Sequence, residues 1–339
     1  MDQATASAPL PSEVVEAPAH LMSIVVPVYR GARTLDALAE ELAPLTTPQT
    51  SPKGHRFRVA EVFLVHDGAV DDSDVVMEKL AARYPFISLI WLSRNYGQHP
   101  ATLAGMASTT CEWVVTLDED GQYDPAYLGP LLDRALETGA QLVYAIGTNA
   151  ASHGFLRNAA SGTVKLLATS VFGLASLGRF SSYRLVNGEV ARSLAAYCGN
   201  HVYLDVALSW VVGRSERCPV KLRDEGERVS GYSWRSLFSH FGRLVLTSGT
   251  RPLRMISVLG VFAICVGIAI FFYALWQKVT MQVPVQGWTS TVLVICFFSG
   301  CILFSLGVVA EYLGVALSMA MGKPLYLVVG RPLRRPQKP

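Results

Sequence analysis

The 339-residue chain is 51% hydrophobic and only 16% charged, which is too apolar for an ordinary soluble domain and for a disordered chain. Eighteen basic and 25 acidic residues precede Arg228, whereas 11 basic residues and one acidic residue, Glu311, occur from Arg228 onward. An acidic front and a basic, apolar back predict a folded domain followed by a membrane-bound part, and they argue against nucleic-acid binding, which would need basic residues on the folded domain.

Residues 1–20 are mostly small, proline and acidic residues, and they contain no basic segment followed by an apolar one. We therefore expect a disordered leader and not a signal peptide. Short apolar runs then alternate with amphipathic stretches, the runs being residues 22–28, 59–65, 86–92, 111–117 and 141–147. This alternation predicts an α/β domain with a mostly parallel sheet that is buried on both faces.

Polar residues follow each apolar run, where the carboxyl ends of parallel strands collect ligands. Asp67 follows the second run, and Asp118 and Asp120 follow the fourth. Two carboxylates one residue apart can share a divalent cation and leave coordination positions for phosphates, although this pattern alone is also common in turns. No glycine-rich loop of the nicotinamide or P-loop type follows the first run, so those nucleotide sites are not expected.

The second half of the chain contains the predicted membrane segments. Residues 232–250 form an amphipathic pattern that fits a helix in the membrane interface or one packed on the folded domain. Residues 255–276 and 289–310 are uncharged runs of 22 residues, each spanning roughly 33 Å as a helix, against a hydrocarbon core of roughly 30 Å. Basic residues outside the two runs place both termini and Lys323 in the cytoplasm and Lys278 on the other side.

Four segments, SIVVPVYRGARTL, VFLVHDGAVDDS, LSRNYGQHPATLAGM and VVTLDEDGQYDP, occur in this order in the chain. They resemble the nucleotide-binding half of family-2 inverting glycosyltransferases with a GT-A fold. More narrowly, they resemble the polyprenyl-phosphate glycosyltransferases, which include dolichol-phosphate mannose synthases and undecaprenyl-phosphate sugar transferases. VSGYSWRSL and VVAEYLGVAL extend this resemblance from about residue 21 to about residue 325.

The resemblance implies a GT-A glycosyltransferase domain at residues 21–230, with a nucleotide-sugar-binding, mostly parallel sheet. Amphipathic juxtamembrane helices at 231–254 would follow, then a transmembrane hairpin of helices 255–276 and 289–310, and a basic cytoplasmic tail at 311–339. This organisation predicts a multi-pass protein of the inner (plasma) membrane with its catalytic domain on the cytoplasmic side.

Residue roles also follow from the resemblance. Asp118 and Asp120 would hold Mg²⁺ or Mn²⁺ on the donor diphosphate, and Gln122 would lie beside the sugar or the lipid phosphate. The residues that would bind the nucleotide-sugar or the two phosphates are Pro27, Tyr29, Asp67, Arg184, Arg228, Ser230 and Tyr232. Of these, Asp120, Gln122 and Arg228 are the expected catalytic residues, and Arg94, Asn95 and Gly97 would shape the loop beneath the metal.

The chain departs from the family pattern at two places. His66 stands where the family usually has the first aspartate of Asp-Asp-Gly-Ser, and Ala69 stands in place of the serine. Arg30 replaces a usual asparagine. These departures leave the identity of the nucleotide base open.

The expected reaction transfers one sugar, with inversion, from a nucleotide-sugar to a polyprenyl phosphate. A lipid phosphate is already anionic near neutral pH, so no side chain has to remove a proton from it. Two alternatives remain open: a membrane glycosyltransferase with another lipid or glycan acceptor, and a non-catalytic membrane scaffold with the same fold. The resemblance also implies a possible homo-oligomer, while the sugar is not determined.

Overall fold

The computed structural model describes residues 18–148, 180–199, 203–223 and 287–331, together with residues 260, 262, 265–270, 272, 273 and 276. The predicted roles of Arg228, Ser230 and Tyr232 fall outside these residues, as do the predicted leader up to residue 17 and the amphipathic segment 231–254.

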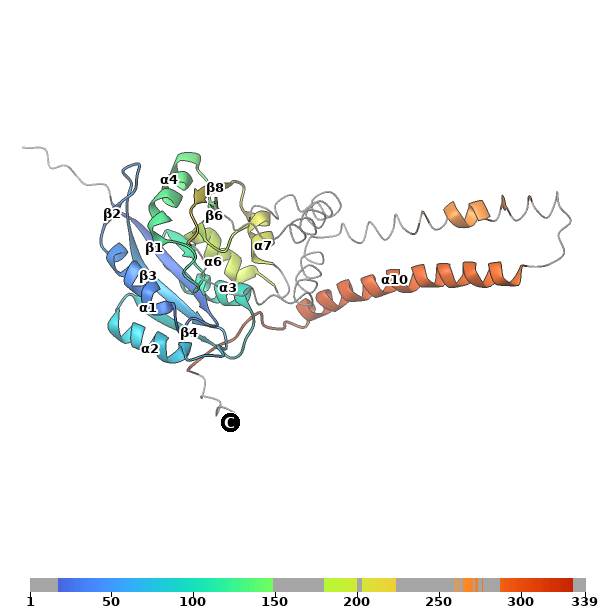
Figure 1. Cartoon of the computed structure of the whole chain (residues 1–339), viewed down its shortest axis with the longest axis horizontal. Coiled ribbons are helices and arrows are strands. Elements are labelled where there is room, and N and C mark those ends of the chain that lie inside the picture. Colours follow the sequence, from blue (N-terminus) through green and yellow to red (C-terminus); the bar gives the residue numbers. More distant parts are fainter. Residues whose placement is uncertain are drawn as a thin grey trace, which may run out of the picture.

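The folded domain is an α/β structure built on a mixed, mostly parallel sheet (Figure 1). Its strands in the described part of the chain are β1 (His20–Val28), β2 (Gln49–Thr50), β3 (Arg56–His66), β4 (Ile87–Leu92), β5 (Trp113–Thr116), β6 (Leu142–Gly147), β7 (Arg184–Asn187), β8 (Ser215–Val220) and β9 (Val328–Val329). Its helices are α1 (Leu35–Leu42), α2 (Ser73–Arg83), α3 (Gln98–Ser108), α4 (Leu128–Thr138), α6 (Gly188–Tyr197) and α7 (Leu204–Val211), with short 3-10 turns at Ala43–Thr46 and Pro125–Tyr127.

The centre of the sheet confirms the predicted parallel arrangement. Strands β5, β1, β3 and β4 are neighbours and all run parallel, so their carboxyl ends lie on one edge. Strand β7 was not predicted, and it lies antiparallel between β5 and β6. Its four residues are too few to show a hydrophobic period, and β6 is thereby displaced one position from β5.

Helices cover both faces of the sheet because successive strand residues point to opposite sides. Met22, Ile24 and Val26 of β1 belong to one buried core, which includes α1, α2 and α4. Val25, between them, belongs to the other core, which includes α3, α6 and α7. The chain therefore forms three layers, as the continuous apolar runs predict.

One close approach explains the glycine in α3. A Cβ atom added at Gly105 would lie 2.2 Å from Cγ1 of Val25 on β1. Glycine therefore lets α3 lie directly on the central strand. This packing places the first residues of α3 beside the loops that follow β3 and β5.

The C-terminal half contains a single long apolar helix in the part that the structure describes. Helix α10 (Trp288–Ala320) has a stretch, Phe297–Leu317, that is long and apolar enough to cross a membrane, and none of it is buried inside the protein. The helix continues ten residues beyond the predicted span 289–310, because a lone Glu311 does not interrupt it, and the bounds of the span itself stay a prediction. The described residues between 260 and 276 are helical, and most of the other predicted span lies outside the description.

The segment after α10 is not the simple tail that we predicted for residues 311–339. The chain turns at Gly322, which has a φ of 64°, and β9 pairs antiparallel with β4. The Ser93 amide donates to the Leu327 carbonyl at 2.9 Å, and Arg331 forms an ion pair with Glu78 at 2.8 Å. The edge of β4 has unpaired backbone groups, and this returning segment satisfies some of them.

Candidate active site

The loops that follow β1, β3 and β5 meet at the carboxyl edge of the sheet. Glu119, after β5, accepts hydrogen bonds from the backbone amides of Tyr29 at 2.8 Å and Arg30 at 2.7 Å. Asp71, after β3, accepts from the Ala32 amide at 3.1 Å. Two acidic side chains from different loops therefore hold the backbone that follows β1.

Glu119 was not among the predicted site residues. It lies in the turn after β5, where side chains do not follow the two-residue period of a strand, so no pattern in the sequence directs it towards β1. Burial raises the pKa of Glu119 to about 7, while the two amide hydrogen bonds oppose that rise.

The Glu119→Ala variant should bind the nucleotide donor at least about tenfold more weakly, because two charge-assisted hydrogen bonds to the β1 loop are lost. Glu119→Gln should have an intermediate effect, since one amide oxygen remains as an acceptor. Isothermal titration with the donor nucleotide measures the change.

The matched control for Glu119 is Glu112→Gln. Glu112 stands just before β5, at the opposite end of the strand, where it pairs with His20 at 2.8 Å. Equal donor affinity in Glu119→Ala and the wild type would show that the loop after β1 does not depend on the Glu119 carboxylate.

Asp67 is buried, with 3% of its surface exposed, directly after β3. Its two carboxylate oxygens accept hydrogen bonds from the backbone amides of Tyr96 at 2.7 Å and Gly97 at 2.8 Å. Gly68 is needed beside it, because its φ is +61° and an added Cβ would lie 2.6 Å from the Asn95 nitrogen. Asp67 thereby fixes the loop that follows β4, and this agrees with the shaping role expected for Gly97.

Donor binding should weaken as the pH falls through about 6, because burial raises the pKa of Asp67 to about 6. Protonation removes the negative charge and one hydrogen-bond acceptor, and the carboxylate is restored above this pH. The ionised fraction of Asp67 is about fourfold lower at pH 5.5 than at pH 7.5, so we expect nucleotide affinity to fall by up to about fourfold.

The same titration on Asp67→Asn serves as the control for this pH dependence, since an amide does not titrate in this range. A wild-type affinity that stays constant between pH 5.5 and 7.5 would contradict the role assigned to the Asp67 carboxylate.

Tyr29 and Pro27, the other predicted nucleoside contacts, are half-buried at the end of β1 and its following loop.

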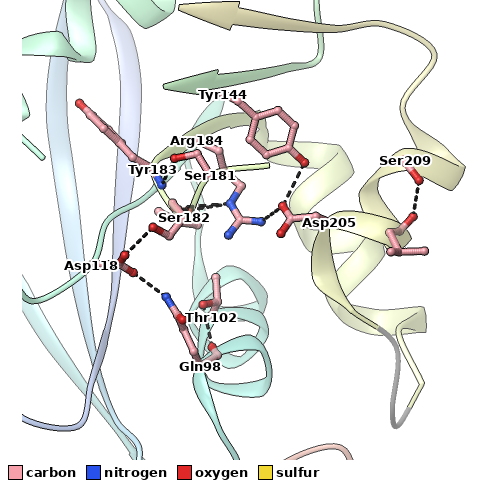
Figure 2. A network of polar contacts seen from close by, with 12 residues as sticks. Gln98, Thr102, Asp118, Tyr144, Ser181, Ser182, Tyr183, Arg184, Asp205 and Ser209 are labelled. Atoms are coloured by element: carbon pink, nitrogen blue, oxygen red, sulfur yellow. Dashed lines mark hydrogen bonds and ion pairs between the residues drawn. The ribbon is translucent and has the colours of Figure 1, made fainter. Parts of the chain in front are cut away.

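Asp118 and Asp120 stand after β5 as predicted. The Asp118 carboxylate accepts from Gln98 Nε2 at 2.5 Å and from the Ser182 hydroxyl (Figure 2). Burial, with a smaller contribution from the negative charge of Asp120, raises the pKa of Asp118 to about 6, whereas the Ser182 hydrogen bond opposes the shift. Ser182 and Gln98 were not among the predicted site residues, although Gln98 follows Gly97 and Ser182 lies two residues before Arg184.

Gln122 lies in the turn that follows the two aspartates. Its backbone amide donates to Oδ1 of Asp120 at 3.1 Å, and its backbone carbonyl accepts from the Arg223 backbone amide at 3.0 Å. The Arg223 guanidinium forms an ion pair with Asp124 at 3.0 Å. The turn is therefore held from both sides.

The two aspartates suit a hard divalent cation by their chemistry. In the residues that the structure describes, no group of three or more His, Cys, Asp or Glu side chains gathers to hold a metal. Carboxylate oxygens have about four lone-pair sites, so the hydrogen bonds to Asp118 leave positions for a cation. A site with two protein carboxylates and open positions is the type in which Mg²⁺ also binds substrate phosphates.

Arg184 has a different setting from the one predicted. It lies on β7 with 3% of its surface exposed, and its guanidinium forms an ion pair with Asp205 of α7. Its Nε donates to the Thr116 hydroxyl at 3.1 Å, and the Tyr144 hydroxyl donates to Asp205 at 3.0 Å. Figure 2 shows this buried network beside Asp118. The placement favours a supporting role for Arg184 over a direct phosphate contact.

His66 ends β3, next to Asp67. Its ring lies 4.8 Å from that of Trp91, and burial lowers its pKa. Its Nδ1 atom is buried and has no hydrogen-bond partner among the described residues. His66, which departs from the family pattern, therefore packs against Trp91, and burial favours its uncharged form. The negative charge beside it comes from Asp67.

Comparison with known proteins identifies the family that the folded domain matches. The pattern of Glycosyl transferase family 2 matches residues 23–184, which include β1, β5, both aspartates and Arg184. Residues 23–184 are a family 2 glycosyltransferase domain.

Relatives match beyond this domain. A bactoprenol glucosyl transferase of Shigella phage SfX is 25% identical over 315 residues, which cover 91% of this chain and 99% of the relative. The uncharacterized glycosyltransferase YkcC of Bacillus subtilis is 26% identical over 309 residues, covering 90% of this chain and 92% of the relative. The chain is thus related to the bactoprenol glucosyl transferases along nearly its whole length.

Among solved structures, one similar protein is glucosyl-3-phosphoglycerate synthase from Mycobacterium tuberculosis, in complex with Mn²⁺, uridine-diphosphate-glucose and phosphoglyceric acid. It is 17% identical, with a TM-score of 0.47, and the match covers 68% of this chain and 79% of that chain.

Proposed function

We propose that this protein transfers a single sugar from a nucleotide-sugar donor to a polyprenyl phosphate of the undecaprenyl type. Glucose is the sugar we favour, because relatives aligned along 79–91% of the chain are named bactoprenol glucosyl transferases. The product is a polyprenyl-phosphate-linked sugar formed with inversion at the anomeric carbon.

One observation carries the proposal: an aspartate pair at the carboxyl edge of a sheet and a long apolar helix belong to one folded body. Strand β9 continues from α10 into the sheet by pairing with β4. A Cβ added at Gly199, after α6, would lie 3.7 Å from Cε of Met319 on α10. The aspartates of the proposed donor site and the helix that would hold a lipid acceptor are therefore parts of the same folded body.

The reaction needs no base from the protein. An oxygen of the lipid phosphate forms the new bond to the anomeric carbon, and the bond from that carbon to the nucleotide diphosphate breaks. The lipid phosphate is largely dianionic at neutral pH, with a second pKa of about 6, so no proton has to move. The leaving diphosphate takes the electron pair, and its charge is what the site must stabilise.

Asp118 and Asp120 would hold the divalent cation, Mg²⁺ or Mn²⁺, which supplies neutralisation of the diphosphate charge when it is bound. Gln98 and Ser182 orient Asp118, and the Gln122 amide orients Asp120. Glu119 and Asp67 hold the loops that would receive the nucleoside. These contacts are present before substrate arrives, which lowers the reorganisation needed in the transition state.

The remaining predicted residues complete the proposal. Arg228, with Ser230 and Tyr232, would close over the two phosphates, since a guanidinium can form two parallel hydrogen bonds to phosphate oxygens. Gln122 would contact the sugar or the lipid phosphate.

We also propose a two-helix membrane hairpin with both termini and the catalytic domain in the cytoplasm. A Cβ added at Gly267, in the first apolar run, would lie 3.1 Å from the ring of Phe298 on α10. That close contact supports packing of the two helices against each other, as small residues permit in membranes. The distribution of basic residues supports the orientation.

The deciding experiment supplies the purified full-length protein with labelled nucleotide-glucose donors, Mg²⁺ or Mn²⁺, and either undecaprenyl phosphate or undecaprenol. We expect transfer to the phosphate alone, giving a product that mild acid hydrolyses. Transfer to undecaprenol, or an acid-resistant product, would favour another acceptor. Absence of transfer and of donor hydrolysis with every nucleotide would favour the scaffold alternative.

A further inference from the structure

Three apolar side chains at the ends of α6 and α7 are exposed on the folded domain. Tyr197 is 88% exposed at the end of α6, and Trp210 and Val211 are 63% and 52% exposed at the end of α7. The other side of α7 is buried and contributes Leu204, Ala207 and Leu208 to the core. We call Tyr197, Trp210 and Val211 the α6–α7 surface.

The α6–α7 surface lies near the end of the apolar helix. Gly199, two residues after Tyr197, is the residue whose added Cβ would contact Met319. Met319 lies two residues beyond Leu317, where the apolar stretch of α10 ends, which is about 3 Å along the helix axis. Figure 1 shows α7 on the side of the domain from which α10 extends.

We propose that the α6–α7 surface rests in the head-group region of the bilayer that holds α10. The proposal depends on the membrane placement of α10 given under the proposed function. Tyrosine and tryptophan favour this region because one part of each ring system is apolar and the other can hydrogen-bond. Arg214, exposed three residues after Val211, lies 3.4 Å from Glu216 and adds a cation that can approach anionic head groups.

A bilayer suits this surface better than a protein partner, because the end of a membrane-crossing stretch lies next to it. The three side chains sit at the ends of two helices. Contact with lipid would hold the domain at a second place besides α10. Since α7 also carries Asp205, the same contact supports the buried network beside Asp118.

The test uses spin labels on the full-length protein in nanodiscs that contain anionic lipid. Single cysteines replace Tyr197, Val211, Leu303 or Lys53 after the six native cysteines are substituted and transfer activity is confirmed. Leu303 is 69% exposed on α10 and reports whether that helix is in the bilayer. Lys53 is exposed in the turn between β2 and β3, and Figure 1 shows β2 far from α10. Accessibility to oxygen and to a water-soluble nickel chelate is then compared.

We expect labels at 303 to favour oxygen strongly, labels at 197 and 211 to be intermediate, and the label at 53 to favour nickel. If 303 favours oxygen while 197 and 211 behave like 53, the surface proposal fails and the membrane anchor stands. If 303 also behaves like 53, the membrane part of the proposed function fails. Labels at 197 and 211 that are shielded from both reagents would show that protein covers the surface, which also overturns the proposal.

A second measurement avoids replacing the cysteines. Brominated lipids quench tryptophan fluorescence only at short range, so the wild type and Trp210→Phe are compared in nanodiscs with and without bromine. We expect the quenched part of the emission to be smaller in Trp210→Phe. An identical quenched part in both proteins would place Trp210 away from the lipid.

Discussion

The Asp120→Asn variant should lose at least about 1000-fold in kcat, which corresponds to about 4 kcal/mol of transition-state stabilisation. An amide has no charge, so the cation on the donor diphosphate would lose one of its two protein carboxylates. The fold should be retained, because among the residues that the structure describes Oδ1 of Asp120 accepts from the Gln122 backbone amide, and an asparagine side-chain oxygen can do the same. Single-turnover transfer at saturating donor measures the loss.

A matched control for Asp120 comes from the same segment. Asp124 accepts from the Ala126 amide at 2.8 Å and pairs with Arg223, so Asp124→Asn removes a nearby charge without changing the aspartate pair. We expect this variant to keep most of the turnover. Comparable turnover in Asp120→Asn and Asp124→Asn, with a divalent cation still required, would place the metal ligands elsewhere.

The Arg184→Met variant should be destabilised by about 3–5 kcal/mol, because it leaves the Asp205 carboxylate buried without its ionic partner. Burial raises the pKa of Asp205, and Arg184 opposes that rise. Without Arg184 the folded-state pKa lies further above the unfolded one. The ionised Asp205 carboxylate then destabilises the folded state, so the loss of stability in Arg184→Met should grow as the pH rises from 5 to 8.

Thermal unfolding of the detergent-solubilised full-length protein tests this second prediction. The double variant Arg184→Met with Asp205→Leu should recover much of the lost stability, since no charge then remains buried. Arg134→Met, which breaks an exposed pair with Glu216, should change little. An Arg184→Met protein as stable as the wild type at pH 8 would show that Asp205 has another buried partner.

The same variants separate a supporting role from a phosphate contact for Arg184. A supporting residue would lower kcat through Ser182 and Asp118, and the double variant would restore part of it. A phosphate ligand would raise the KM for donor or acceptor in both the single and the double variant. The network in Figure 2 favours the first result.

Much of the fold could be predicted from the first 147 residues. The runs that became β1, β3, β4, β5 and β6 are mostly apolar, and α1 and α4 repeat their buried apolar residues at helical spacing. In α4, for example, Leu128, Leu131, Leu132 and Ala135 are buried, and the helix ends at Gly139 with a φ of 63°. Local patterns of this kind do not depend on distant contacts, so they can be recognised from the sequence alone.

The positions of Asp67, Asp118 and Asp120 were also predictable, because parallel strands bring their carboxyl ends to one edge. What the side chains contact there was not. In the sequence Glu119 only separates two aspartates, yet its carboxylate accepts hydrogen bonds from two backbone amides of the loop after β1. The resemblance predicts Arg184 as a phosphate ligand, yet its guanidinium forms an ion pair with Asp205, 21 residues later.

The amino-acid sequence by itself determined the α/β class, the edge where the acidic residues gather and the presence of long apolar segments, since each depends on the order of residues along the chain. Only the tertiary structure decided that β7 separates β5 from β6, that β9 returns to β4 and that Arg184 pairs with Asp205. Those features join segments far apart in the chain; Trp91 and Val329, for example, are 238 residues apart. Such pairings depend on which strand edge or buried charge is still unsatisfied once the rest has packed.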